Sequence, residues 1–202
     1  IAEPDIACIL NIHGVHLEGL GSIEGVAEAK EELFSTTSKD ALHIINLDDE
    51  RVVNCGMHHT QKKVRYAATD RGLAQNPDIW AESIDVDDRG HLSFILHVKE
   101  QQSRLKIHAP GLHNSSNACA AAAIAYAGGI DFDIIIRGLE DFRSPANRME
   151  TLKSPLGLNI LNDTYNANPA SMASGLKTFV QLPAVKRLAI LGDMLELGEA
   201  SG

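Results

Sequence analysis

Apolar residues gather in short, uninterrupted runs in the first part of the chain. Such runs occupy residues 5–12 and 41–47, and neither alternates with polar positions, which is typical of strands buried on both faces of a sheet. Between them, Ser22 is a natural N-cap for a helix over residues 23–34, and Glu24 in its first turn favours the helix dipole. The order strand, helix, strand predicts an α/β fold with a mostly parallel sheet and flanking helices.

Strand and helix patterns of the same kind continue as far as residue 142. Four further segments are expected to be strands, at residues 64–69, 79–86, 91–99 and 104–108. Residues 87–90 carry the clearest hairpin signal. An alanine-rich helix is expected over residues 114–127 with Asn114 as its N-cap, and a second helix over residues 132–142 capped by Asp131.

The composition changes after these helices. Residues 143–147 (RSPAN) are a plausible linker. Beyond it, a helix is expected over residues 171–182, among strands at residues 149–152, 158–162 and 187–191. A strand, helix, strand order predicts the parallel opening of a second α/β domain. Because the chain starts in a strand and stops soon after one, we expect it to be a piece of a longer protein.

Composition and charge exclude several functional classes. The chain has 202 residues, a net charge of −9 and a pI near 5.4, so binding to nucleic acid through a basic surface is not expected. No apolar run approaches the roughly 18 residues of a membrane span. Cys8, Cys55 and Cys119 are widely spaced and odd in number, which disfavours a disulfide framework or a zinc finger and fits a reducing cytoplasm.

Two candidate metal-site residues follow the first strand. His16 lies in a glycine-rich segment, residues 14–21, where a parallel sheet presents ligands at the carboxyl ends of its strands. It is either a metal or phosphate ligand or a loop histidine without a role. Lys30 lies among glutamates on the next helix, and a solvated, ion-paired face explains it. A desolvated lysine amine can also take up carbon dioxide and ligate a metal as a carbamate.

Two asparagines open the alanine-rich helix. Asn114 and Asn117 are three residues apart and therefore share one helix face. Carboxamides present both hydrogen-bond donors and acceptors, which suits the edge of a purine. A capping role would by itself account for Asn114.

Polar residues also follow the linker. Arg148 is either structural or a bidentate phosphate ligand. The stretch at residues 163–169 is explained by turn chemistry alone, but a strand's carboxyl end is also where a nucleotide ribose would bind. The phosphate-loop pattern G-x-x-x-x-G-K-[ST] does not occur in the 202 residues.

Four segments together resemble the Mur ligase family, in its MurF type, which joins D-alanyl-D-alanine to UDP-N-acetylmuramoyl-tripeptide. They are HLEGLGSIEGVAEAKEELF (16–34), PGLHNSSNACAAAAIA (110–125), DTYNANPASM (163–172) and KRLAILGDMLELGE (186–199). The last two are the most specific. Other Mur ligases and folylpolyglutamate synthases share the His-Asn-x-x-Asn pattern but differ around DTYNANP. The sequence departs from the family at His13 and Asn147, where glycine is usual, and in the polar residues 54–63, where a helix is expected.

The resemblance implies a three-domain protein of which this chain holds two parts. Residues 1–145 would be the ATP-binding central domain, incomplete at its N-terminus, and residues 146–202 the beginning of a Rossmann-like C-terminal domain. The substrate-binding domain, the phosphate loop and a magnesium-binding glutamate would lie outside the chain.

The resemblance also implies roles for individual residues. It assigns His16 and Lys30 to the magnesium site, with Lys30 carbamylated, and Arg148 to the ATP phosphates; these three would be catalytic. The nucleotide-binding residues it implies are Asn114, Asn117, Asp163, Tyr165, Asn166 and Asn168, with Asp163 holding the ribose.

The implied reaction is ATP-dependent amide formation. ATP phosphorylates the tripeptide carboxylate, and the amine of D-alanyl-D-alanine attacks the acyl phosphate, releasing phosphate after ADP. The implied setting is peptidoglycan synthesis in the bacterial cytoplasm, by a monomer that binds no nucleic acid. Without a phosphate loop, this chain alone is expected to be inactive. The alternatives are another Mur or folylpolyglutamate-type ligase, or a non-catalytic α/β interaction module.

Overall fold

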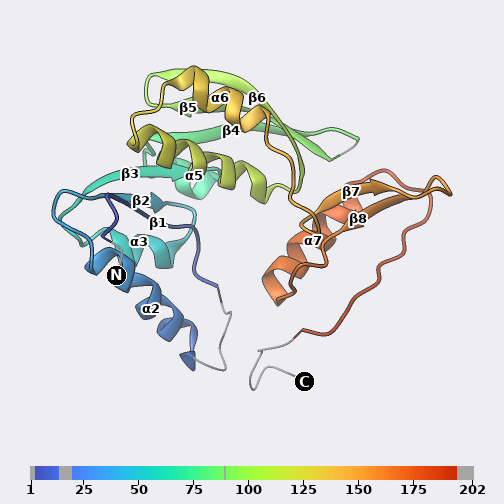
Figure 1. The fold of residues 1–202 in the computed structure, drawn as a ribbon, viewed down its shortest axis with the longest axis horizontal. Helices are drawn as coiled ribbons and strands as arrows, with labels where there is room; N and C mark the ends of the chain where they lie inside the picture. The colour runs from blue at the N-terminus through green and yellow to red at the C-terminus, as the bar shows by residue number, and fades with distance from the viewer. Residues whose placement is uncertain (1–2, 14–19, 89, 195–202) are drawn as a thin grey trace.

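A six-stranded sheet with helices on both faces makes up the larger part of the structure (Figure 1). The structure is a computed structural model that describes residues 3–13, 20–88 and 90–194. The strands lie side by side in chain order: β1 (Ile6–Ile9), β2 (Leu42–Asn46), β3 (Lys62–Ala67), β4 (Ile79–Val86), β5 (His91–Val98) and β6 (Gln101–Pro110). The first four are parallel, and β5 and β6 continue the sheet antiparallel. The predicted α/β sheet and its hairpin between β4 and β5 are confirmed.

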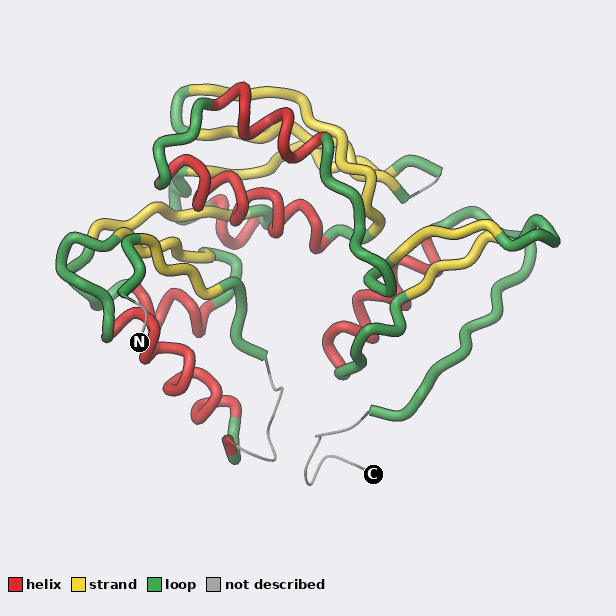
Figure 2. Tube along the Cα trace, viewed as in Figure 1, coloured by secondary structure: helices red, strands yellow, loops and turns green. Residues whose placement is uncertain are grey.

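The helices separate into two layers (Figure 2). On one face α2 (Ile23–Ser35) packs near β1 and α3 (Glu50–Gly56) near β2, while α5 (His113–Ala127) and α6 (Phe132–Glu140) cover the other face. Neighbouring residues of β2 therefore enter different cores: Ile44 packs with the α5 side and Ile45 with the α2 side, and both are fully buried. Two covered faces explain why these strands are apolar without alternation.

Aspartate and serine caps fix where the first helices begin. Ser22 accepts a hydrogen bond from the Gly25 amide at 3.1 Å, so the predicted N-cap is confirmed. Asp49 caps α3 and also accepts the Ile12 amide at 2.8 Å, which ties this helix to the chain that leaves β1. The helix expected over residues 54–63 is misplaced, because α3 begins at Glu50, directly after this aspartate, and ends at Gly56. A single further turn, α4 (Asp70–Leu73), follows β3.

The N-cap of α5 differs from the prediction. The cap is Leu112, and Asn114 lies inside the first turn, where its side-chain amide donates to the Pro110 carbonyl at 2.8 Å. The Asn114 side chain therefore hydrogen-bonds a carbonyl of the segment that enters the helix, and it does not cap the amides of the first turn. Asp131 does precede α6, as predicted, but its side chain makes no capping hydrogen bond.

The second unit is a strand hairpin followed by a helix. β7 (Glu150–Lys153) and β8 (Asn159–Asn162) pair antiparallel, and α7 (Pro169–Gln181) follows. The prediction of a strand at residues 187–191 is wrong: the segment belongs to no strand, and Leu188 and Ile190 are 80% and 90% exposed. A strand is stable only when it pairs with another, and no described strand lies beside this segment. The parallel strand, helix, strand unit is therefore not formed by the described residues.

Candidate functional site

The carboxyl ends of β1, β2 and β3 form one edge of the sheet, and Lys30 reaches it from α2. The Lys30 ammonium donates to the Asn11 carbonyl at 2.6 Å, just beyond β1. Asn46, at the end of β2, donates to the Leu10 carbonyl at 2.7 Å. These bonds hold the chain after β1 in place and bring the Lys30 amine to the edge at which α/β proteins bind ligands.

Of the predicted magnesium pair, His16 and Lys30, only Lys30 lies among the described residues. Residues 14–19, and with them His16, lie outside the described residues. Lys30 is half-buried, and its bond to Asn11 uses one N–H. A carbamate formed on this nitrogen keeps one N–H, so the contact with Asn11 is compatible with carbamylation. Its carboxylate oxygens would be ligands of the hard type that Mg²⁺ prefers.

Asn114 and Asn117 lie on one face of α5, as their spacing predicts. The Asn117 amide donates to the Asn114 side-chain oxygen at 3.2 Å. Asn114 is buried and also donates to Pro110, whereas Asn117 is exposed. Asn117 therefore keeps its carbonyl oxygen and one N–H available for a ligand, and Asn114 orients it.

Three other candidate residues come together around the start of β7 and the end of β8. The Arg148 guanidinium lies 3.7 Å from the centroid of the Tyr165 ring, a cation–π stack. One Asp163 carboxylate oxygen accepts the Met149 amide at 3.1 Å. The Tyr165 amide donates to the Asn147 carbonyl at 3.0 Å. The loop after β8 is thus bound to the segment that carries Arg148.

Asn166 and Asn168 have local structural roles. The Asn166 side chain accepts the amide of Ala167 at 2.8 Å. Asn168 caps α7 in a reciprocal capping box: its side chain accepts the Ser171 amide at 2.9 Å, and its own amide donates to the Ser171 hydroxyl at 3.1 Å. Turn and cap chemistry accounts for both residues in the structure.

His113 links the two groups of candidate residues, and sequence reasoning gave it no role. Its Nδ1 lies 3.3 Å from the Ser174 hydroxyl of α7. Partial desolvation lowers the pKa of His113, and the negative charge of Asp163 acts in the opposite direction. A Cβ on Gly111, where φ is +102°, would lie 3.4 Å from the Thr178 hydroxyl, so the start of α5 packs directly against α7. The only sequence signal was the position of His113 immediately before Asn114.

No helix in the described part of the chain is both long enough and apolar enough to cross a membrane.

Comparison with known proteins gives a consistent result. Residues 1–125 match the family model of the Mur ligase middle domain, and residues 147–202 match that of the Mur ligase, glutamate ligase domain. The UDP-N-acetylmuramoyl-tripeptide–D-alanyl-D-alanine ligase of Escherichia coli K12 is 33% identical over 202 residues, which are 100% of this chain and 43% of that protein.

Solved structures show the same fold. Crystal structure I of MurF from Acinetobacter baumannii has a TM-score of 0.87 and 27% identity, covering 98% of this chain and 42% of its own. MurF ligase from Thermotoga maritima in complex with ADP has a TM-score of 0.82 at 22% identity, covering 99% and 44%. The chain thus spans less than half the length of these relatives. Because the middle-domain model alone matches more than half of the chain, and because a mostly parallel six-stranded sheet with helices on both faces is present, the chain belongs to the Mur ligase family.

Proposed function

We propose that the chain provides the nucleotide-contacting surface of an ATP-dependent ligase of the MurF type. The reaction joins D-alanyl-D-alanine to UDP-N-acetylmuramoyl-tripeptide through an acyl phosphate, in the cytoplasm of a bacterium that builds peptidoglycan. The observation that carries the proposal is the contact between His113 and Ser174. It joins the helix that presents Asn117 to the helix that follows Asp163, and in this proposal residues of both matched domains face one ligand.

Asn117 and Asp163 bind the nucleoside in this proposal. Asn117 offers a free carbonyl oxygen and one N–H to the purine edge, and Asn114 positions it. One oxygen of Asp163 is held by the Met149 amide, and the other faces Gly175, where an added Cβ would lie 3.5 Å away. That second oxygen is available to accept a ribose hydroxyl, with Tyr165, Asn166 and Asn168 on the same loop.

Arg148 binds the phosphates. Its neighbours Asn147 and Met149 both have left-handed backbone, with φ of 62° and 51°, which costs on the order of 1–3 kcal/mol at each non-glycine residue. Strain on both sides of one arginine fits a side chain held in a required direction, and the Tyr165 ring supports it from one face. A guanidinium in that position can hold two phosphate oxygens at once.

Lys30 and His16 hold magnesium in this proposal. Bound Mg²⁺ neutralises negative charge on the transferring phosphoryl group. Lys30 acts as a carbamate, which its place at the carboxyl edge and its half-buried position support. Arg148 also neutralises phosphate charge, and closure of the second unit over the first excludes water from the acyl phosphate.

We also propose a domain boundary and a limit to activity. The central domain comprises residues 1–145 and the C-terminal domain begins at residue 146, since α6 ends at Glu140 and β7 begins at Glu150. The phosphate-loop pattern does not occur in the 202 residues, so the chain alone should bind nucleotide weakly and should not turn over. The full ligase acts as a monomer.

Isothermal titration of the purified chain with ADP and with Mg-ATP tests this function. We expect weak binding, a loss of affinity of about tenfold or more in Asn117→Ala, equal to about 1.4 kcal/mol, and a similar loss in Asp163→Asn. Asn54→Ala is the matched control, because Asn54 is an exposed asparagine on α3. Unchanged binding by Asn117→Ala, or no binding by a folded chain, would contradict the proposal.

A further inference from the structure

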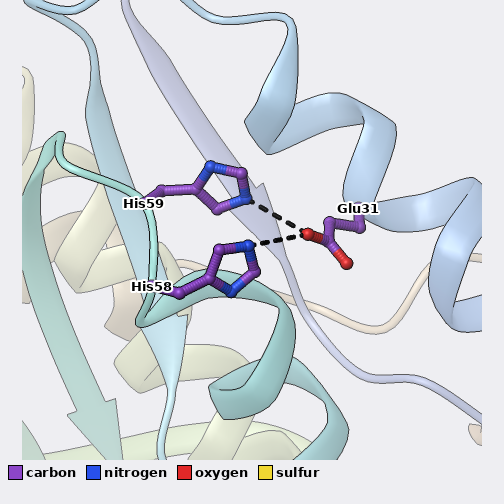
Figure 3. A group of neighbouring side chains, drawn as sticks. All are labelled: Glu31, His58 and His59. Atoms are coloured by element: carbon purple, nitrogen blue, oxygen red, sulfur yellow. Dashed lines mark ion pairs between the residues drawn. The ribbon is translucent and has the colours of Figure 1, made fainter.

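A second group of chemically active side chains lies away from the nucleotide edge. Glu31 extends from α2, and His58 and His59 extend from the turn between α3 and β3 (Figure 3). The histidines precede Lys62, the first residue of β3, so they lie towards the amino ends of the parallel strands, opposite the edge that Lys30 reaches. The proposed ligase function uses none of the three.

Two of the three distances between the donor atoms of this group are close to those of a tetrahedral metal site. The Nε2 atoms of His58 and His59 lie 3.0 Å and 3.4 Å from the same Glu31 carboxylate oxygen. All three donor atoms lie within 4.8 Å of one another. Zinc bonds to imidazole nitrogen and carboxylate oxygen are about 2.0–2.2 Å long, which separates two donors of a tetrahedron by about 3.3 Å. The two histidine-to-glutamate distances lie on either side of that value.

The hydrogen bond at Nδ1 of His58 leaves its Nε2 facing the carboxylate. Its Nδ1 lies 3.0 Å from the Asn54 backbone carbonyl. A carbonyl only accepts, so Nδ1 carries the proton, and Nε2 of the neutral ring presents a lone pair to Glu31. Two electron-rich atoms 3.0 Å apart need a cation between them, either a second proton or a metal ion. A backbone carbonyl on the far nitrogen is also the usual partner of a metal-bound histidine.

The Nε2 atom of His59 approaches the same Glu31 oxygen and has no hydrogen-bond partner. Its Nε2 is buried and makes no hydrogen bond, since its 3.4 Å approach to Glu31 lacks hydrogen-bond geometry. Its ring packs edge-on against Phe34 and His43, with centroids 6.1 Å and 5.6 Å apart, which fixes its direction. A buried nitrogen without a partner costs about 1–3 kcal/mol, and a metal ion would remove that cost.

Two nearby groups are compatible with a bound cation. The ammonium of Lys63 donates to the backbone carbonyls of His59 and Gln61, so two of its three N–H groups are engaged by backbone oxygens. The Cys55 thiol donates to the Ala27 carbonyl of α2 at 3.8 Å, so its proton is engaged by the helix backbone. The His58 side chain is 58% exposed, which lets solvent reach the cluster.

We propose that Glu31, His58 and His59 bind a zinc ion, with a water as the fourth ligand. The site joins α2 to the turn after α3, where the His59 ring packs edge-on against Phe34 of α2. A bound ion would hold in place the helix on which Lys30 precedes Glu31, and three protein ligands with one water leave one coordination position open to solvent. Nitrogen and oxygen donors in this number suit zinc, whereas magnesium and calcium prefer oxygen alone.

Titration of the chelator-treated chain with zinc chloride tests the site. We expect one zinc per chain, and a loss of affinity of roughly 100-fold or more in the double variant H58Q/H59Q. His108→Gln is the matched control, since His108 is an exposed histidine of β6 and should leave zinc binding unchanged. Circular dichroism and ADP titration show whether the double variant still folds.

Thermal unfolding gives an independent measurement. Zinc should raise the melting temperature of the unsubstituted chain and of His108→Gln, because a ligand that binds only the folded state stabilises it, and should have no such effect on a folded H58Q/H59Q chain. The proposal is wrong if the unsubstituted chain takes up no stoichiometric zinc. It is equally wrong if the folded double variant binds zinc as tightly as the control.

Discussion

The sheet unit and the β7–β8–α7 unit hold their structures in different ways. The sheet buries apolar side chains on both faces, and residues such as Leu92 and Leu96 are fully buried. In the second unit only Met149 and Thr178 are buried among the described residues. That unit depends instead on local hydrogen bonds, such as the capping box of α7. Hydrophobic burial specifies the first unit, and turn and cap chemistry specifies much of the second.

This difference bears on the candidate site, which draws residues from both units. Asn114 and Asn117 stand on a helix packed into the sheet core. Asp163 and Arg148 stand on loops that are largely exposed. In the proposed function, a rigid half and a more loosely packed half suit closure over a nucleotide, because the moving part must be able to shift without breaking a core.

The largest expected difference is between two leucine truncations. Leu96→Ala removes a fully buried side chain of β5 and should lower the free energy of unfolding by about 2–5 kcal/mol. Leu188→Ala removes a side chain that is 80% exposed and should change it by less than about 0.5 kcal/mol. Urea unfolding followed by circular dichroism measures both. Equal losses would show that the segment after α7 packs into a core.

A smaller effect is expected from acid, through His43 in the sheet unit. Burial, then the charges of His59 and Lys63, lower the pKa of His43 from 6.5 to about 4. The Thr37 hydroxyl donates to the Phe34 carbonyl, so the Nε2 of His43 must donate to the Thr37 hydroxyl oxygen, at 2.8 Å. The Nδ1 of His43 is buried and has no hydrogen-bond partner.

The lowered pKa of His43 determines the direction in which stability changes with pH. The unfolded chain takes up this proton near pH 6.5 and the folded chain only near pH 4, so stability should fall as the pH drops through this window, by up to roughly 3 kcal/mol. Urea unfolding at a series of pH values measures the slope. His43→Phe, which keeps a ring against Phe34, should show a shallower dependence. An unchanged slope in this variant would assign the acid sensitivity to other groups.

The smallest effect compares two caps. Asn168→Ala removes the capping box of α7 and Ser22→Ala removes the cap of α2, each at a cost of about 1 kcal/mol. Because α7 buries few side chains, removal of its cap in Asn168→Ala should appear mainly as faster amide exchange in the first turn of α7. In Ser22→Ala, by contrast, the loss of stability should be shared by the whole sheet unit. Exchange rates in α7 that do not change in Asn168→Ala would contradict this description of the second unit.

The part of the fold that burial specifies could be predicted from the sequence. Unbroken apolar runs located β1 and β2, and Ser22 located the start of α2, because those signals are local. Residues 187–191 carry the same apolar signal but form no strand here, because the signal reports only that a segment is apolar. Whether a neighbour covers it is decided by tertiary structure. The prediction that Asn114 is an N-cap failed for a related reason: its side chain donates to the Pro110 carbonyl, outside the helix.

The candidate site was predictable only within single segments. The shared face of Asn114 and Asn117 follows from helical spacing. The contact between His113 and Ser174 spans 61 residues, and no periodicity reports it. Likewise, neither the local glutamate pattern around Glu31 nor the pair of adjacent histidines indicates that α2 and the turn after α3 meet.

The central claim is that the start of α5 and the loop after β8 form one nucleotide surface. Amide hydrogen exchange of the chain with and without saturating ADP tests it most directly. We predict slower exchange both in the first turn of α5, around Asn114 and Asn117, and in residues 163–168, with both effects lost in Asn117→Ala. Slower exchange confined to one of the two segments, or retained in Asn117→Ala, would contradict the claim.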